Sequence, residues 1–361
     1  MADTKPCRRV VTKRTATLVG VVALSFALSA CQPVPDDATL AELGMTRGRR
    51  IGTAVEPSHV ADPDIATFLA DEFSIVAVEN VMKFGPIHPE RDRYDFAPAD
   101  AIVDAAAANG QHVRGHTLVW HRQNPAWLVG GTWTRDEAIS VLEDHITTVV
   151  THFRGRVDQW DVVNEAVDDT GALRDTFWLR TIGPEYVAMA FEFARAADPD
   201  VALYYNDYLI ERAGAKADRV ERLVDDLMAA GVPIDGVGFQ MHVLVPELMP
   251  SPNALRREFE RYASRGLRVA ITEMDVAHIL PSTPEKFAAQ ADAYDNAIMA
   301  CLAVRACDTI VFWGWSDAES WIDAEFPGFG NALLFDRAGQ PKVAYERIRG
   351  VLWWNLQPPP E

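Results

Sequence analysis

The chain has 361 residues, of which 48% are hydrophobic and 24% are charged, and it contains no long polar tract of the kind that indicates disorder. Its formal net charge of −18 at pH 7 argues against a nucleic-acid partner, because such a surface repels phosphates. Length alone allows one large domain or two ordinary ones, since an α/β barrel can need about 250 residues as a single unit.

The first thirty residues have the composition of a signal peptide. Five cationic residues precede an uncharged apolar run over residues 15–30, which is the order of segments in secretory signals. The run ends in small residues directly before Cys31 and resembles the site at which bacterial lipoproteins are cut and acylated. We expect residues 1–30 to be removed and Cys31 to carry a lipid. Secretion without a lipid is the alternative, and the run is short for the roughly 20 residues of a membrane span.

The ends of the remaining chain are expected to be loose. Residues 31–44 are rich in proline and aspartate without periodicity and predict a lipid-anchored tether, and residues 356–361 predict a flexible tail. No linker interrupts residues 45–355, which favours a single domain there. Cys301 and Cys307 are expected to form a local disulfide in an exported protein, with two buried free thiols as the alternative.

Eight short apolar runs rich in β-branched residues alternate with helical patterns. The expected strands span residues 51–55, 75–79, 111–116, 157–164, 202–206, 236–242, 268–275 and 309–313. The helical stretches include residues 98–108, 134–153, 215–230, 253–264, 284–304 and 342–351, and Thr134 and Glu137 form a capping-box pattern. This alternation predicts an α/β fold in which a parallel sheet closes into a (β/α)8 TIM barrel.

Polar residues cluster at the carboxyl ends of the expected strands, where barrels of this type carry their active sites. Glu165 and Glu273 each follow a strongly apolar strand that would hold the carboxylate rigidly. Cleavage of a glycosidic bond requires two carboxyl groups, one to donate a proton and one to attack the anomeric carbon or activate water. A single glutamate at a strand end is more often an ion-pair partner, so the surrounding residues decide between the two interpretations.

Those residues resemble glycoside hydrolase family 10, whose members are mostly endo-β-1,4-xylanases. The resemblance covers residues 51–351. Its ordered motifs in this sequence are Glu79-Asn80-Val81-Met82-Lys83, Arg114-Gly115-His116-Thr117-Leu118-Val119-Trp120-His121, Trp160-Asp161-Val162-Val163-Asn164-Glu165-Ala166, Tyr205-Asn206-Asp207-Tyr208, Gly238-Phe239-Gln240-Met241-His242, Ile271-Thr272-Glu273-Met274-Asp275-Val276, and the segment from Trp313 to Trp321.

The resemblance implies retaining hydrolysis of internal β-1,4 bonds in xylan, with Glu165 as general acid/base and Glu273 as nucleophile, about 5–5.5 Å apart. It also implies that Asn164 bonds the sugar hydroxyl next to the reacting carbon. His242 would bond Glu273, and Asp275 would orient His242. The sugar-binding residues that it implies are Glu79, Asn80, Lys83, His116, Trp120, Gln123, Tyr208, Gln240, Trp313 and Trp321.

Two positions depart from the family pattern. Phe84 stands where many relatives carry Trp, and Ile322 stands where Arg is common. We expect a modest effect of Phe84 near the glycone side of the site and looser contacts with xylose units or side-chain decorations from Ile322.

No metal or other cofactor is expected, because His116 and His121 lack the spacing of a helical zinc site and the implied mechanism needs none. The expected partner is xylan or a xylo-oligosaccharide, and a monomer is the default. Two alternatives stay open. One is a hydrolase of another β-1,4-glycan or of short xylo-oligosaccharides, and the other is a lipid-anchored sugar-binding protein without turnover.

Overall fold

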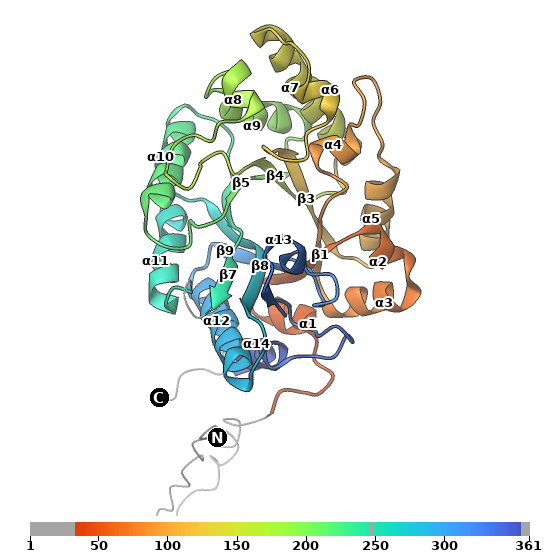
Figure 1. The fold of residues 1–361 in the computed structure, drawn as a ribbon, viewed down its shortest axis with the longest axis vertical. Helices are drawn as coiled ribbons and strands as arrows, with labels where there is room; N and C mark the ends of the chain where they lie inside the picture. Colours follow the sequence, from red (N-terminus) through yellow and green to blue (C-terminus); the bar gives the residue numbers. More distant parts are fainter. Residues whose placement is uncertain (1–32, 246–248, 355–361) are drawn as a thin grey trace, which may run out of the picture. The chain divides into compact units, whose positions relative to one another are not determined.

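The computed structural model describes residues 33–245 and 249–354 (Figure 1). The predicted signal peptide, the lipidation site Cys31 and the tail over residues 356–361 lie outside the described residues. In the described part of the chain, no helix is long and apolar enough to span a membrane.

Eight parallel strands form a closed barrel, which confirms the predicted fold. Each strand pairs with the next barrel strand along the chain, and β9 pairs with β1 to close the sheet. Figure 1 shows the helices as an outer ring around these strands. The barrel strands are β1 (Arg50–Val55), β2 (Ile75–Val78), β3 (His112–Val119), β4 (Gln159–Asn164), β5 (Ala202–Asp207), β6 (Gly236–Phe239), β8 (Arg268–Ile279) and β9 (Cys307–Phe312).

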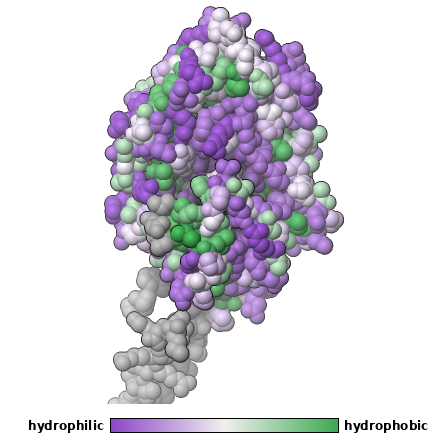
Figure 2. All heavy atoms as spheres, viewed as in Figure 1, coloured by the Kyte–Doolittle hydropathy of each residue, from purple (hydrophilic) through white to green (hydrophobic). Residues whose placement is uncertain are grey.

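The helices agree with the predicted ranges within a few residues, and Thr134 caps α7 with the predicted capping box. Two long helices, α3 and α9, lie in stretches without a predicted range. The face of the molecule seen in Figure 2 is mostly hydrophilic. The long helices are α3 (Pro63–Glu72), α5 (Ala97–Ala108), α7 (Arg135–His152), α9 (Tyr186–Ala197), α10 (Ala215–Ala229), α11 (Pro252–Ala263), α12 (Pro284–Ala303) and α14 (Val343–Trp354); the short ones are α1 (Leu40–Thr46), α2 (Pro57–Ala61), α4 (Phe84–Ile87), α6 (Ala126–Val129), α8 (Phe177–Thr181) and α13 (Ile322–Glu325).

The strands are buried on both faces, because outward side chains meet the helices and inward ones fill the barrel. Inside the barrel, Arg114 on β3 pairs with Asp161 and donates to Gln159, both on β4. Its guanidinium lies 4.5 Å from the ring centre of Tyr204 on β5. All four side chains are buried, so these contacts must offset the desolvation of the ion pair.

The predicted strand over residues 236–242 is wrong in one respect, because the chain forms two strands there. β6 ends at Phe239, and β7 (His242–Val245) starts after Met241, whose φ of 64° lies in the left-handed region. β7 pairs with the outer half of β8, and β10 (Phe329–Gly330) pairs antiparallel with the end of β8. β8 therefore runs past the barrel and has strand partners beyond it.

The expected tether over residues 31–44 is too long. Helix α1 begins at Leu40, which is fully buried, and Thr39 caps it with a capping box. Arg349 on α14 donates to the backbone carbonyl of Ala38 at 3.0 Å. The folded unit therefore includes the second half of the expected tether. The sequence did not predict helix α1 because a helix this short shows no periodicity.

The disulfide between Cys301 and Cys307 is present, as expected, and joins the end of α12 to the start of β9. Both residues are fully buried. A loop this short removes little entropy from the unfolded chain, so the bridge mainly fixes the backbone that enters β9.

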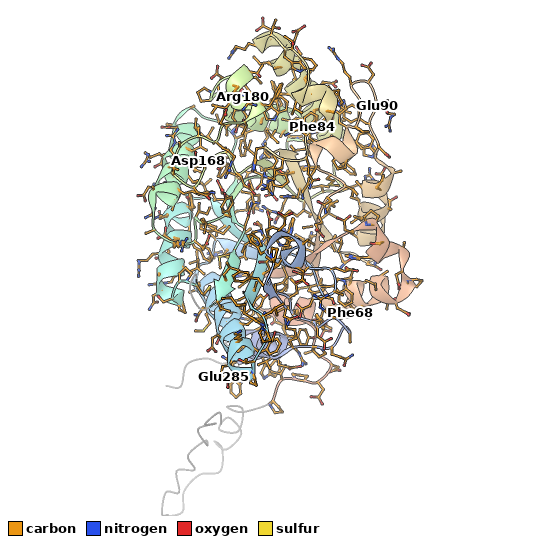
Figure 3. The ribbon with its side chains drawn as sticks, viewed as in Figure 1. Phe68, Phe84, Glu90, Asp168, Arg180 and Glu285 are labelled. Atoms are coloured by element: carbon orange, nitrogen blue, oxygen red, sulfur yellow. A yellow bond between two sulfur atoms is a disulfide. The ribbon has the colours of Figure 1, made fainter. Side chains whose placement is uncertain are left out.

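Phe84 and Ile322, the two departures from the family pattern, are both buried. The Phe84 ring, labelled in Figure 3, stacks on His145 with the ring centres 3.6 Å apart. Ile322 packs in a cluster with Ala277 and Ala332. Because the Phe84 ring is buried, it can affect a bound sugar only through neighbouring residues. The expected effect near the glycone side would therefore be indirect.

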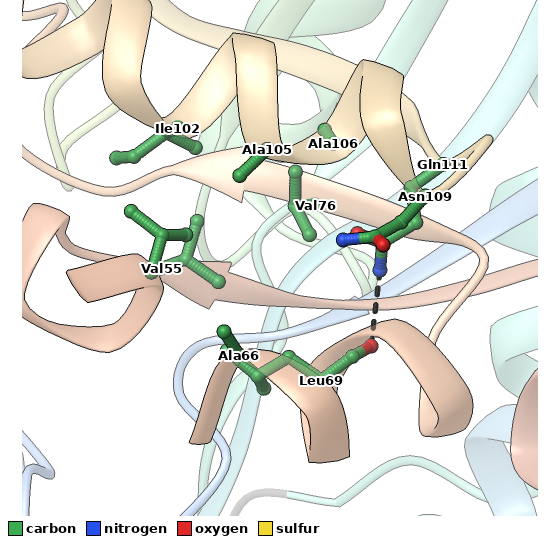
Figure 4. Close-up of a pocket in the computed structure, with 10 residues that line it drawn as sticks. Val55, Ala66, Leu69, Val76, Ile102, Ala105, Ala106, Asn109 and Gln111 are labelled. Carbon is green, nitrogen blue, oxygen red and sulfur yellow. Dashed lines mark hydrogen bonds between the residues drawn. The ribbon is translucent and has the colours of Figure 1, made fainter. Parts of the chain in front are cut away.

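A small cavity lies between α3 and α5 against β1 and β2 (Figure 4). Its volume is about 20 Å³, and its lining is mostly apolar, as at Val76 and Ile102. Gln111 closes one edge by donating to the carbonyl of Leu69 at 3.0 Å. A space of this size holds about one water molecule and is too small for a ligand.

Candidate active site

A cleft of about 680 Å³ opens at the carboxyl ends of the barrel strands. The structure brings together in it every side chain predicted to act in catalysis or sugar binding: Glu79, Asn80, Lys83, His116, Trp120, Gln123, Asn164, Glu165, Tyr208, Gln240, His242, Glu273, Asp275, Trp313 and Trp321. The cleft is also lined by residues without a predicted role, including His121, Arg122, Asp169, Arg174, Val243, Leu244, Glu325 and Phe326.

The two candidate catalytic glutamates come from β4 and β8. Glu165 directly follows β4 and is 9% exposed, and Glu273 lies within β8 and is 4% exposed. Glu165 has a φ of 58°, in the left-handed region that costs a residue with a side chain about 1–2 kcal/mol. The Glu165 amide donates to the carbonyl of Asn206 at 2.9 Å, and the Glu273 amide donates to the carbonyl of Gln240 at 3.1 Å.

Side-chain amides connect the two carboxylates. Asn206 Nδ2 donates to Glu273 Oε1 at 2.6 Å, and Gln240 Nε2 donates to Glu165 Oε1 at 3.1 Å. Because Asn206 must present Nδ2 to a carboxylate, Asn164 faces it with Oδ1, which accepts from Asn206 and from Gln240, each at 3.0 Å. These bonds fix how the two carboxylates lie relative to each other. No role was predicted for Asn206, although it belongs to one of the family motifs and stands at the end of the fifth strand.

His242 on β7 lies between two carboxylates. Its Nε2 is 3.3 Å from Glu273 Oε2, and its Nδ1 is 2.8 Å from Asp275 Oδ2. Burial alone would lower the pKa of His242, but Asp275 and Glu273 together raise it to about 10. Burial would raise the pKa of Glu273, yet His116 and His242 outweigh burial and hold that pKa below its usual value. Glu273 is therefore kept ionised, as a carboxylate nucleophile must be.

Three indole rings face the cleft, from Trp120, Trp313 and Trp321. Lys83 Nζ lies 4.9 Å from the centre of the Trp120 ring. Trp321 Nε1 donates to Asp275 Oδ2 at 2.8 Å, so one carboxylate oxygen contacts both this indole and His242. Rings held in this way can stack on the apolar faces of sugar rings.

Polar side chains near the ends of β1 and β2 form another wall of the cleft. Asn80 Nδ2 donates to Glu56 Oε1 at 2.5 Å and to Glu79 Oε1 at 3.3 Å. Asn80 Oδ1 accepts from Lys83 Nζ at 2.8 Å and from Gln123 Nε2 at 3.1 Å. Burial, reinforced by the charge of Glu56 and opposed by that of Lys83, raises the pKa of Glu79 to about 7. Glu79 therefore changes its charge near neutral pH.

Replacing Glu79 by glutamine is expected to stabilise the protein above pH 7, with no such gain below pH 4.5. The pKa of Glu79 is about 7 in the folded state against an ordinary value of 4.5, so the folded state holds a proton that the unfolded state has lost. The free energy of unfolding of the wild type therefore falls as the pH rises through this window, by on the order of 1–3 kcal/mol. Thermal melts at both ends of the window measure the effect.

The control for this experiment is Glu325→Gln, which removes an exposed carboxylate from the same cleft. We expect it to leave the pH dependence of the melting temperature unchanged. If Glu79→Gln shifts the melting temperature equally at both pH values, the raised pKa of Glu79 is contradicted.

His121 and Arg174 lie beside Glu165. His121 Nδ1 is 3.5 Å from Glu165 Oε2. Burial, together with Arg174 and against the opposing effect of Glu165, lowers the pKa of His121 to about 4, so the ring is neutral at pH 7. Arg174 donates to the carbonyl of Glu165 at 2.8 Å and to the hydroxyl of Tyr208 at 2.9 Å. Neither contact was predicted, and Arg174 lies in a loop whose sequence pattern contains no signal for it.

The site thus places two buried carboxyl groups in one cleft with polar and aromatic walls, and these are the groups that glycosidic-bond cleavage requires. Glu273 has the environment of an ionised nucleophile. Glu165 is connected to Tyr208 by the hydrogen bonds of Arg174. Within the described residues, no group of three or more His, Cys, Asp and Glu side chains is arranged to hold a metal ion.

Comparison with known proteins identifies the family. The sequence profile of glycosyl hydrolase family 10 matches residues 39–351. Endo-1,4-beta-xylanase B of Thermotoga neapolitana is 42% identical over 344 residues, which cover 94% of this chain and 99% of that protein. Endo-1,4-beta-xylanase A of Phanerodontia chrysosporium is 40% identical over 314 residues, covering 86% of this chain and 76% of that protein.

Solved structures agree with the sequence comparison. Xylanase 10B of Thermotoga petrophila RKU-1, determined in complex with xylobiose, superimposes with a TM-score of 0.87 at 43% identity and covers 90% of this chain and 99% of its own. Native xylanase 10B of Thermotoga maritima superimposes with a TM-score of 0.85 at 45% identity over 87% of this chain and 98% of its own. The chain therefore belongs to glycosyl hydrolase family 10.

Proposed function

We propose that the protein is an endo-1,4-β-xylanase that hydrolyses internal β-1,4-xylosidic bonds of xylan with net retention. The observation that carries this proposal is the pair Glu165 and Glu273 in one cleft, connected through Asn206, Asn164 and Gln240. Family membership and relatives named as endo-1,4-beta-xylanases support the choice of substrate. The complex of the Thermotoga petrophila enzyme with xylobiose supports a xylo-oligosaccharide ligand.

In the first step, a carboxylate oxygen of Glu273 attacks the anomeric carbon. The bond from that carbon to the leaving oxygen breaks, and Glu165 transfers its proton to this oxygen, so the leaving chain departs with a free hydroxyl group. The product on the enzyme is a glycosyl ester of Glu273. The contact with His242 at 3.3 Å supports the ionised state of Glu273 from which the attack starts.

In the second step, a water oxygen attacks the same carbon while the Glu165 carboxylate accepts a proton from that water. The ester bond to Glu273 breaks and Glu273 leaves as a carboxylate, which restores both groups to their starting states. Two inversions at one carbon give net retention. We assign to Asn164, the neighbour of Glu165, the bond to the hydroxyl next to the reacting carbon, and to Asp275 the orientation of His242.

We assign sugar binding to side chains that line the same cleft and offer either a ring face or a hydrogen-bonding group. The aromatic members form stacking surfaces, and the polar members lie where they can bond hydroxyl groups. Tyr208 is assigned to the leaving-group side because Arg174 hydrogen-bonds both its hydroxyl and the backbone carbonyl of Glu165, the candidate proton donor. The assigned residues are Glu79, Asn80, Lys83, His116, Trp120, Gln123, Tyr208, Gln240, Trp313 and Trp321.

We also propose that the protein is exported and anchored by a lipid on Cys31. The cationic segment, the apolar run and the small residues before Cys31 support this assignment, with residues 1–30 as the signal peptide. The disulfide between Cys301 and Cys307 suits an oxidising compartment outside the cytoplasm.

A panel of polymers tests the proposed activity. The full chain is incubated with unsubstituted xylan, carboxymethyl-cellulose, mixed-linkage glucan and short xylo-oligosaccharides, and the products are followed by chromatography and proton NMR. We expect xylan to be cut fastest, into an early mixture of chain lengths whose new ends are first β-anomers. Faster cleavage of a glucan, or attack on short oligosaccharides alone, would favour the other hydrolases. Binding without any turnover would favour the sugar-binding protein.

A further inference from the structure

The loop that follows Glu165 folds back on itself. Asp168, labelled in Figure 3, accepts from the backbone amides of Thr170 and Ala172 at 2.9 and 3.0 Å, and the Arg174 amide donates to the carbonyl of Ala166 at 2.8 Å. This closed loop brings the side chain of Arg174 back to the start of the loop, where it contacts the backbone of the candidate acid/base.

The Arg174 guanidinium makes three hydrogen bonds that join two parts of the site. Nε donates to the carbonyl of Glu165 at 2.8 Å, and Nη2 donates to the carbonyl of Val167 at 3.1 Å and to the hydroxyl of Tyr208 at 2.9 Å. The Glu165 carbonyl belongs to the residue with left-handed backbone. That conformation persists only where neighbouring contacts hold it.

Tyr208 is fixed from its other sides as well. Its hydroxyl donates to Asp169 Oδ1 at 2.5 Å, and Lys216 Nζ lies 3.1 Å from the centre of its ring. Lys216 is buried and pairs with buried Asp207 at 2.8 Å, so the support under the ring is itself fixed. Arg174 connects this supported ring to the backbone of Glu165.

We propose that Arg174 is a positioning residue that holds the Glu165 backbone and Tyr208 as one unit, so that a sugar bound on the leaving-group side meets the acid/base at proton-transfer distance. This inference rests on the proposed function. Arg174 touches neither the proton nor the reacting carbon and acts through Glu165. A proton donor must lie about 2.6–3.2 Å from its acceptor, and a displacement of about 1 Å can cost 100-fold in rate.

The experiment compares Arg174→Lys and Arg174→Gln with the wild-type full chain. We expect kcat on xylan to fall by about 10- to 100-fold in both variants. Lysine keeps the charge but has one nitrogen, which cannot reproduce a fork that bonds three oxygens. The matched control is Arg180→Gln, which removes an exposed arginine (labelled in Figure 3) that pairs with the exposed carboxylate of Asp175. The control is expected to stay within about twofold of the wild type.

Azide separates positioning of the acid/base from a general structural role. With dinitrophenyl xylobioside, the leaving group needs no proton, so a variant with a misplaced Glu165 forms the ester of Glu273 readily and then hydrolyses it slowly. Azide displaces Glu273 from the sugar without a general base and yields the glycosyl azide. We expect azide to accelerate both Arg174 variants several-fold and to leave the wild type and Arg180→Gln unchanged.

Tyr208→Phe shows whether the bond of Arg174 to Tyr208 or its bond to Glu165 positions the acid/base. It removes the hydroxyl that Arg174 binds but leaves the bond to Glu165, so we expect weaker binding of xylan and no acceleration by azide. The proposal is overturned if the Arg174 variants keep wild-type activity. It is also overturned if their loss of activity equals their loss of correctly folded active sites, which are counted with a fluorinated xylobioside that traps Glu273. A wild type without any turnover would instead sink the proposed function.

Discussion

Replacing Glu273 by alanine is expected to lower kcat on xylan by about 10⁵-fold or more, which is the scale of removing a nucleophile from an enzyme that works through a covalent intermediate. Glu273 is the carboxylate whose ionised state the site maintains through His116 and His242. In the proposed mechanism Glu165 carries the proton for the leaving oxygen, so it cannot replace Glu273 as the nucleophile. Initial rates on xylan, followed by reducing ends, measure the loss.

The control for this variant is binding of xylohexaose by calorimetry, which should persist because the aromatic walls and polar residues of the cleft remain. Glu273→Gln adds a second control, since it keeps the size of the side chain and removes only its charge. Residual turnover of Glu273→Ala with β-configured products above one part in a thousand of the wild-type rate would show that another group attacks the anomeric carbon.

Replacing Glu165 by alanine is expected to lower activity on xylan by about 10²- to 10⁴-fold, the range of general acid/base catalysis. The loss should depend on the leaving group. A sugar alkoxide needs the proton that Glu165 supplies, whereas dinitrophenolate does not, so formation of the glycosyl ester from dinitrophenyl xylobioside should stay close to the wild-type rate. A burst of dinitrophenol followed by slow turnover is the measurement.

His121 provides a matched control, because it lies 3.5 Å from the Glu165 carboxylate but is neutral at pH 7. We expect His121→Asn to show no burst of this kind. If Glu165→Ala slows formation of the glycosyl ester from dinitrophenyl xylobioside by the same factor as cleavage of xylan, Glu165 does not act as the proton donor.

The barrel and the position of the site could be predicted from the sequence. Eight apolar runs separated by helices leave few alternatives to a closed parallel sheet, and the chemistry of such a barrel gathers at its carboxyl edge. For that reason Glu165, His242 and Glu273, far apart in the chain, could be placed in one cleft before any contact was known.

Other features depend on local backbone geometry that composition does not encode. The left-handed turn at Met241 splits the predicted sixth strand and aims His242 at Glu273, yet methionine is not a residue that signals such a turn. Helix α1 is too short to show a period. Arg174 lies in a loop, and its partners are two backbone carbonyls and one hydroxyl that only the folded chain brings together.

The two glutamates differ in how many strands pair with the backbone around them, and this difference predicts which of them is displaced first when the protein is heated. Glu273 lies in the middle of a twelve-residue strand, β8, which pairs with β6 before Glu273, with β9 on both sides of it, and with β7 and β10 beyond it. Glu165 stands at the end of its strand, before a loop. Regions with fewer shared backbone bonds open first, at lower free energy than the global transition. Partial opening is therefore expected to free the acid/base before the nucleophile, and protein in that state would capture an activated sugar and release it slowly.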